Sequence, residues 1–321
     1  MLKILVAVLA VLVILLAGAY LSAGYVIYDR LANVRGSCDE HMANRPDRFA
    51  LHPDWTATFD VSPYFMSPYE TVRFPSRQPC ITIAGWWVPQ APNAPAVIVV
   101  DGLGGCKNSI AVLTPAGMLW RSGFNVLLID LRDTGDSDYE DGRSAIGNEE
   151  YQDVLGAWDW LIATKGFKPE RIGVYANSLG AATALYAFSE EPRVAAIFLN
   201  SPFGNLNQVL REELQRNHYP TFLAPGAIIV GRIVAGDNVV AHDPLSAIRK
   251  AGTRPVFILH SRDDTRIAFH HAGQLAAAAR AAGVKVTTWF IDKAEHMRAA
   301  AVYPEEFEGK MAEFFKGALG N

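Results

Sequence analysis

Hydrophobic residues are distributed along this chain in two distinct patterns. In the first 28 residues, only Lys3, Gly18, Ser22 and Gly24 are not hydrophobic. Beyond residue 68, short runs rich in Val, Ile and Leu alternate with segments in which apolar residues recur every three or four positions. The first pattern predicts one long apolar helix, and the second predicts β-strands that alternate with amphipathic helices.

The N-terminal apolar segment is long enough to cross a membrane. Residues 4–27 carry no charge. At about 1.5 Å per residue, a helix of these 24 residues is long enough to span a hydrocarbon core of about 30 Å. Tyr20, Tyr25 and Tyr28 lie at its C-terminal end, where aromatic rings favour the membrane interface. The alternative is a cleaved signal peptide, because residues 17–19 are all small. We favour an uncleaved anchor, since the apolar run continues past that site.

The charges around the anchor leave the orientation of the chain open. Lys3 and the α-amino group favour a cytoplasmic N-terminus, whereas Arg30, Arg35, Arg45 and Arg48 follow the span and favour the opposite arrangement. We expect single-pass attachment to the cell membrane, with the exported side slightly favoured for the rest of the chain.

The remainder of the chain has the element order of an α/β protein. The middle strands are nearly continuous apolar runs, as expected of strands buried on both faces. Alternating strands and helices predict a mostly parallel sheet that is covered by helices on both faces. Strands are predicted at 71–74, 81–88, 96–100, 125–131, 171–175, 194–199, 256–260 and 285–291, and helices at 151–162, 206–215, 275–282 and 305–319.

These patterns define the expected domains. We expect a transmembrane anchor over 1–28, a juxtamembrane linker and N-terminal extension over 29–68, and one catalytic domain over 69–321. The connection at about 202–250 is long for a compact domain and contains an apolar stretch at 222–234. Connections of this length are usually functional, so a lid over a pocket is one interpretation. An extra packed helical layer is the other.

Composition narrows the function classes. Lys and Arg total 29 against 33 Asp and Glu, giving a formal charge of −4, which argues against a nucleic-acid partner. Cys38, Cys80 and Cys106 do not identify the compartment, because one pair could bridge in an oxidising environment while an odd count leaves the pairing open.

Ser178 is the best candidate nucleophile. A predicted buried strand leads into Ala176-Asn-Ser178-Leu-Gly180 and directly into an alanine-rich helix. A turn this tight requires small residues two positions before and two after the serine, and it exposes the hydroxyl at a helix N-terminus. An ordinary serine at a helix N-cap is the alternative.

Asp264 and His296 are the candidate partners of this serine. Both follow predicted strands, and the order Ser178, Asp264, His296 is the order of the α/β-hydrolase fold. Asp263 competes with Asp264, but Ile267 lies three residues after Asp264, where the chain re-enters the core. Of the other histidines, His260 ends a strand and shapes the site or packs, whereas His270 and His271 begin a helix.

The backbone N–H groups of Leu103 and Leu179 are the candidate oxyanion hole. Leu103 lies in the glycine-rich loop 101–105, where glycines allow close approach of backbone to a ligand. The chain has neither a P-loop nor a Gly-x-Gly-x-x-Gly motif, and its cysteines and histidines lack metal-ligand spacing. We therefore expect no cofactor and no metal.

Several motifs in order resemble one superfamily over residues 70–320. The chain resembles the Ser-dependent α/β-hydrolases, in particular the bacterial serine aminopeptidase-like and BEM46-like hydrolases, many of which carry an N-terminal membrane anchor. The resemblance implies the α/β-hydrolase fold, with an eight-stranded sheet and a lid insertion. It rests on DGLGG at 101–105, DLRDTGDS at 130–137, GNEEYQD at 147–153, ANSLG at 176–180, NSPF at 200–203, HSRDD at 260–264 and EH at 295–296.

The sequence departs from the pattern of these relatives at three motifs. Asp101-Gly102 and His260-Ser261 stand where the relatives usually have His-Gly, and the His of their Arg-x-His-Gly-x-Ser motif is replaced in 132–137. A carboxylate at Asp101 would be unfavourable beside a developing oxyanion. These departures affect the expected rate and substrate rather than the fold.

The sequence thus predicts a membrane-anchored serine hydrolase that cleaves a carboxylic ester through an acyl-enzyme. Its expected partners are a small-molecule ester or acyl substrate and, through the N-terminal helix, a membrane. A peptidase or acyltransferase with the same triad is one alternative, and a tethered binding module without turnover is another. The substrate-binding residues and the oligomeric state are left open.

Overall fold

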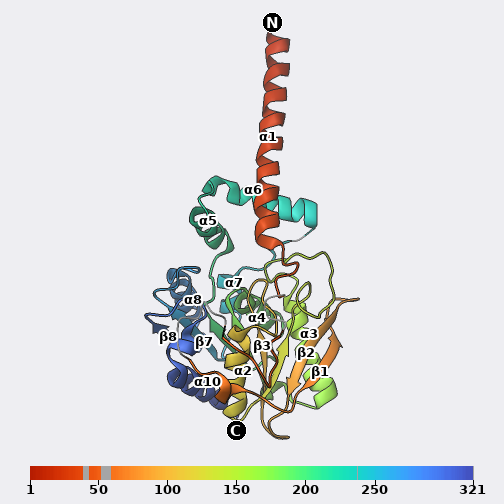
Figure 1. The fold of residues 1–321 in the computed structure, drawn as a ribbon. Coiled ribbons are helices and arrows are strands. Elements are labelled where there is room, and N and C mark those ends of the chain that lie inside the picture. Colours follow the sequence, from red (N-terminus) through yellow and green to blue (C-terminus); the bar gives the residue numbers. More distant parts are fainter. Residues whose placement is uncertain (39–42, 52–58, 237, 321) are drawn as a thin grey trace.

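The computed structural model describes residues 1–38, 43–51, 59–236 and 238–320, and its centre is an eight-stranded sheet (Figure 1). All eight predicted strands are present, and each boundary lies within two residues of its prediction. The strands are β1 Glu70–Pro75, β2 Thr82–Val88, β3 Ala96–Val100, β4 Asn125–Ile129, β5 Ile172–Asn177, β6 Ala196–Asn200, β7 Val256–Ser261 and β8 Val286–Ile291.

The strand order places the carboxyl ends of the central strands side by side. The order is β1-β2-β4-β3-β5-β6-β7-β8. β2 pairs antiparallel with both β1 and β4, and the other neighbouring strands are parallel. Loops that leave β3, β5, β7 and β8 therefore start at the same edge of the sheet. This is the α/β-hydrolase fold that the sequence predicted.

Helices cover both faces of the sheet, and a further group of helices, α1, α5 and α6, lies beyond the edge of the sheet (Figure 1). One apolar core joins a sheet face to α3, α4, α7 and α8, and a second joins the other face to α2, α9 and α10. The helices are α1 Leu2–Ala32, α2 Ile110–Arg121, α3 Tyr151–Lys165, α4 Ser178–Glu190, α5 Leu206–Arg216, α6 Ala224–Val230, α7 Pro244–Arg249, α8 His270–Ala281, α9 Ala299–Val302 and α10 Pro304–Leu319.

α1 projects away from the body of the molecule for most of its length (Figure 1). Among the described residues it is the one helix long and apolar enough to cross a membrane. Its buried residues are Gly24, Ile27, Tyr28 and Ala32, all in the C-terminal part of the helix. Tyr28, expected at a membrane interface, is instead buried against the rest of the protein.

Described parts of the segment predicted as a linker pack against the sheet and its covering helices. α1 continues to Ala32, and Phe49, Val61, Tyr64 and Met66 are buried in the apolar core that contains α2 and α10. The division of the chain into domains at residues 28 and 68 stays a prediction.

The long connection after β6 forms a small helical layer beside α1. It contains α5, α6 and α7, and α6 crosses α1 near the point where α1 meets the body (Figure 1). We call the segment 206–233, which contains α5 and α6, together with the C-terminal part of α1 (Tyr20–Ala32), the helical cap. Its own apolar cluster is separate from the two cores of the sheet and includes Ile27, Tyr28, Leu214, Leu223 and Ala227.

Candidate active site

Ser178 occupies the sharp turn between β5 and α4. Its φ is +50°, a left-handed conformation that non-glycine residues adopt mainly in tight or strained turns. A Cβ on Gly180 would lie 2.1 Å from the carbonyl oxygen of Asp101, so this position excludes every side chain. The small residue that the sequence required two positions after the serine is therefore dictated by the neighbouring loop.

The loop after β3 lies against Ser178 and supplies the second candidate amide. A Cβ on Gly102 would lie 3.0 Å from the Ser178 Cβ, so the loop backbone runs directly beside the nucleophile. The Leu179 N–H is in the first turn of α4, where no preceding helical turn supplies a carbonyl to accept its hydrogen bond. The Leu103 N–H donates to no backbone carbonyl among the described residues. Both predicted oxyanion donors thus flank Ser178.

A continuous line of hydrogen bonds joins Ser178, His296 and Asp264. The Ser178 Oγ lies 2.9 Å from His296 Nε2, and His296 Nδ1 lies 2.7 Å from Asp264 Oδ2. Because Nδ1 faces a carboxylate, the ring carries its proton there, and Nε2 is free to accept the Ser178 proton. The fold brings Ser178 within hydrogen-bond distance of His296, which lies 118 positions later in the sequence.

Asp264 is held as a carboxylate by its loop. Its Oδ1 accepts hydrogen bonds from the backbone N–H groups of Arg266 at 2.9 Å and Ile267 at 2.8 Å. Burial is the largest influence on the pKa of Asp264 and raises it, but the hydrogen bond and charge of His296 and the other partners outweigh burial and lower it. Asp263, the competing acid, is exposed and instead accepts from the Lys293 N–H at 2.6 Å.

His260 positions the Asp264 loop. Its ring is completely buried, its Nε2 lies 2.8 Å from the Ile267 carbonyl oxygen, and the same nitrogen lies 3.4 Å from Asp264 Oδ2. Burial lowers its pKa, so the ring is neutral and donates from Nε2. Sequence reasoning placed His260 near the site without this role. Its position at the end of β7, four residues before the acid, was the available signal.

Asp101 is turned into its own loop. Its Oδ1 accepts a hydrogen bond from the Gly102 N–H at 2.8 Å, and the carboxylate fills the space beside Gly105, where a Cβ would come within 2.3 Å of Oδ2. The carboxylate thereby stabilises the bend that presents Leu103. The effect of this carboxylate on an oxyanion stays a prediction.

A buried lysine that sequence reasoning missed stabilises the loop after β3. Lys107 is fully buried, and its Nζ contacts Asp130 Oδ2 and lies 2.6 Å from Asp136 Oδ2. Burial disfavours its charge, but the two carboxylates outweigh burial and raise its pKa. The ion pairs tie the loop after β3 to the end of β4. Nothing in the local pattern around Lys107 distinguishes it from a surface lysine.

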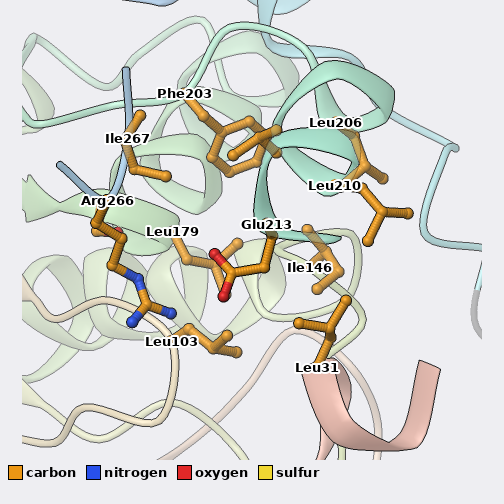
Figure 2. Close-up of a pocket in the computed structure, with 12 residues that line it drawn as sticks. Leu31, Leu103, Ile146, Leu179, Phe203, Leu206, Leu210, Glu213, Arg266 and Ile267 are labelled. Atoms are coloured by element: carbon orange, nitrogen blue, oxygen red, sulfur yellow. The ribbon is translucent and has the colours of Figure 1, made fainter. Parts of the chain in front are cut away.

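An apolar pocket opens above Ser178. It has a cavity volume of about 100 Å³, and its walls come from the sheet edge, from α5 and from α1 (Figure 2). Leu103 and Leu179, whose amides are the candidate oxyanion donors, also line it with their side chains. The lining residues are Leu31, Leu103, Ile146, Ser178, Leu179, Phe203, Leu206, Val209, Leu210, Glu213, Arg266 and Ile267.

A polar cluster joins α5 to the start of α8. Glu212 Oε1 lies 3.1 Å from His270 Nε2, and Glu212 Oε2 lies 3.1 Å from His271 Nε2. Within the described part of the chain this is the one group of His, Cys, Asp or Glu side chains spaced closely enough to hold a metal ion. His271 Nδ1 accepts from the Gly204 N–H at 3.2 Å, so its Nε2 carries a proton and donates to Glu212. This tautomer makes the cluster a hydrogen-bonded contact rather than a ready set of metal ligands.

A comparison with protein families finds a match over the C-terminal two thirds of the chain. The family model for the prolyl oligopeptidase family matches residues 114–321, which is more than half of the chain. The chain belongs to the prolyl oligopeptidase family. This family member therefore belongs to the serine α/β-hydrolase superfamily, as the motifs predicted.

Solved structures match the fold of this prolyl oligopeptidase family member. The Pyrococcus furiosus esterase Pf2001 has a TM-score of 0.64 at 23% identity, and the match covers 86% of this chain and all of that one. The Pyrococcus horikoshii acylaminoacyl peptidase has a TM-score of 0.58 at 18% identity, with 79% of this chain and 42% of that one covered. At such identities the likeness shows the fold alone.

Sequence relatives cover shorter regions. An uncharacterized protein of Mycobacterium tuberculosis is 32% identical over 175 residues, 49% of this chain and 58% of its own length. The lysophosphatidylserine lipase ABHD12 of Rattus norvegicus is 27% identical over 191 residues, 56% of this chain and 44% of its own length. The chain spans about half the length of the curated relatives it matches.

Proposed function

We propose that this chain is a membrane-anchored serine hydrolase that cleaves carboxylic esters with Ser178, His296 and Asp264. One observation carries the proposal: the unbroken hydrogen-bonded line from the Ser178 hydroxyl through His296 to Asp264, at the base of an apolar pocket. A structural serine at a helix N-cap would need neither this line nor the left-handed φ of Ser178.

The reaction follows from the positions of these groups. His296 Nε2 takes the Ser178 proton as Oγ attacks the ester carbonyl, and Asp264 stabilises the imidazolium that forms. The Leu103 and Leu179 N–H groups stabilise the oxyanion, a contribution worth about 10²–10³ in rate for each donor. His296 then gives its proton to the leaving alkoxide, which departs as the alcohol. Water, deprotonated by the same histidine, releases the acid and restores Ser178.

The pocket favours an acyl group of apolar character. Its lining is mostly Leu, Ile, Val and Phe, and such walls stabilise a chain by about 25 cal/mol per Å² of apolar surface buried. The likeness to a lysophosphatidylserine lipase supports an ester of a hydrophobic acid. We further propose that α1 anchors the enzyme in the cell membrane and that the segment 202–250 acts as a lid over the catalytic domain 69–321.

A peptidase is the second candidate. The match to the prolyl oligopeptidase family and the fold of an acylaminoacyl peptidase both support cleavage of an amide by the same triad. An amide substrate requires His296 to protonate a poorer leaving group, but it requires no other change in the mechanism.

Covalent labelling tests the nucleophile. We expect a fluorophosphonate to label the full-length protein, and Ser178→Ala to abolish labelling and lower ester kcat by at least about 10³. Ser201→Ala is the matched control, because Ser201 follows the neighbouring strand β6, is buried and also has a positive φ. Labelling that persists in Ser178→Ala refutes the assignment. Faster cleavage of aminoacyl amides than of p-nitrophenyl esters would establish the peptidase instead.

A further inference from the structure

Leu31, in the last turn of α1, lies where three cavities meet. It lines the pocket above Ser178, a second cavity toward α6, and a third between α1 and the end of α5. The helix that we propose as a membrane anchor therefore also contributes a wall to the substrate pocket. Figure 2 shows the Leu31 side chain at the edge of this pocket, beside Ile146 and near Leu210.

The cavity toward α6 is an apolar arm. It shares Leu31, Ile146, Leu206 and Leu210 with the pocket above Ser178, and it continues between α1 and α6. None of the described residues that line it is charged, and its volume is about 40 Å³. Its lining is Tyr28, Leu31, Ala32, Ile146, Leu206, Leu210, Ala227, Ile228 and Val239.

The third cavity is a polar arm on the opposite side of the pocket. It shares Leu31, Leu103, Glu213 and Arg266 with the pocket and has a volume of about 130 Å³. Figure 2 shows the Glu213 carboxylate and the Arg266 guanidinium together on this side, away from Leu206 and Leu210. Arg30, Asn217 and Tyr219 complete its polar walls. The two arms therefore differ in polarity, and both adjoin the pocket that Ser178 lines.

The apolar arm ends at α6, which lies in a segment with an exposed apolar surface of its own. α6 belongs to a short apolar helix over Thr221–Ile233, and its outer face exposes Phe222 by 63% and Ile233 by 73%. α6 packs on α1 so closely that a Cβ on Gly24 would lie 2.7 Å from the Gly226 carbonyl carbon. The α6 contact lies in the C-terminal part of α1, so with α1 inserted in a bilayer the exposed face of α6 would lie near that end of the candidate span.

We propose that α1 is a wall of the substrate site as well as an anchor, and that the substrate is a single-chain amphiphilic ester drawn from the bilayer. Its acyl chain lies in the apolar arm, its carbonyl at Ser178, and its polar headgroup in the arm with Glu213 and Arg266. This inference rests on the proposed esterase function. It adds the bilayer as the source of substrate and assigns Leu31 to acyl-chain selection.

The decisive variant is Leu31→Trp in the full-length enzyme reconstituted in phosphatidylcholine vesicles. The larger ring fills the junction of the cavities, so the ratio of kcat/KM for a dodecanoyl ester to that for an acetyl ester falls tenfold or more. Leu31→Ala removes apolar contacts with the chain and lowers the same ratio about threefold. Val26→Trp is the matched control, because Val26 lies on α1, is 61% exposed and lines none of the three cavities. Equal ratios in Leu31→Trp and Val26→Trp overturn the inference.

A second measurement does not depend on turnover. Ser178→Ala protein is placed in vesicles that contain a lysophospholipid with a diazirine at the end of its acyl chain. Photolysis labels the 206–210 segment of α5, and Leu31→Trp abolishes that labelling. Labelling of α1 alone, without α5, overturns the proposed chain position. If the wild-type enzyme cleaves neither ester, the proposed function fails, whereas this labelling still decides whether lipid occupies the apolar arm.

Discussion

The edge of the sheet and the helical cap above it are stabilised in different ways. Ser178 and Asp264 follow β5 and β7, which are buried along their whole length, and His296 follows the edge strand β8. The loops around this site are fixed by buried hydrogen bonds and ion pairs. The cap rests on one small apolar cluster and leaves Phe222, Ile229 and Ile233 exposed. The sheet edge is complete without a membrane, whereas the cap has apolar surface that a bilayer would cover.

Under the proposed function, this difference separates the residues that set the reaction rate from those that select the acyl chain. The positions of Ser178, His296 and Asp264 depend on contacts within the sheet and its covering helices, so changes there are expected to alter the rate with every substrate. The shape of the pocket above Ser178 depends on α1 and α5, so changes in the cap alter which acyl chains are accepted. The three predictions below test this separation, from the largest expected effect to the smallest.

Asp264→Asn is expected to have the largest effect. An amide at this position can donate to His296 Nδ1, which stabilises the tautomer that cannot accept the Ser178 proton. We expect kcat to fall by about 10³–10⁴ with acetyl and dodecanoyl esters alike.

Asp263→Asn is the control for this prediction. It makes the same chemical change one residue away, in a side chain that contacts Lys293 rather than His296. Its kcat is expected to stay within about threefold of the wild type, because no group of the triad is altered. Steady-state kinetics of both variants measure the difference, and similar losses in the two would contradict the role given to Asp264.

The sheet edge could be predicted because its signals are local. Strands buried on both faces are continuous apolar runs, and the turn at Ser178 requires small residues on either side. Asp264 was favoured over Asp263 because Ile267 follows it by three residues. The Ile267 N–H donates one of the two backbone hydrogen bonds that the Asp264 carboxylate accepts. Each of these features lies within a few residues of the group it positions.

The contacts that sequence reasoning missed join distant segments. Lys107 lies in the loop after β3 and contacts Asp130 and Asp136 beyond the end of the neighbouring strand β4, and no local pattern distinguishes it from a solvated lysine. Leu31 was missed for another reason. α1 is apolar on every side, so its periodicity does not indicate which face packs against the protein. The position of the cap depends on that packing and could not be derived from the pattern.

Gly24→Leu tests the cap without changing a residue of the pocket. The new side chain cannot fit between α1 and α6, because a Cβ alone would come within 2.8 Å of the Gly226 carbonyl oxygen. We expect the two helices to separate and the dodecanoyl-to-acetyl ratio of kcat/KM to fall about threefold to tenfold. Gly18→Leu is the control, since nothing lies within 4 Å of that position. A fall in acetyl-ester activity as large as the fall in dodecanoyl-ester activity would mean that the cap also governs the chemistry.

The smallest effect is expected at His271, where α8 of the catalytic body meets α5 of the cap. Burial lowers its pKa, while Glu212 raises it less and the neighbouring His270 and His260 lower it further. Below about pH 6.5, the His271 ring therefore becomes protonated in the unfolded chain but stays neutral in the folded protein. The free energy of unfolding consequently decreases as the pH falls. The decrease is at most about 1.4 kcal/mol per pH unit for one proton.

Denaturant unfolding of the full chain in detergent at pH 7 and pH 5.5 is expected to show a smaller decrease for His271→Gln than for the wild type. Gln274→Asn alters the same α5–α8 contact without removing a titrating group. If it reduces the pH dependence equally, packing rather than the proton links the two regions.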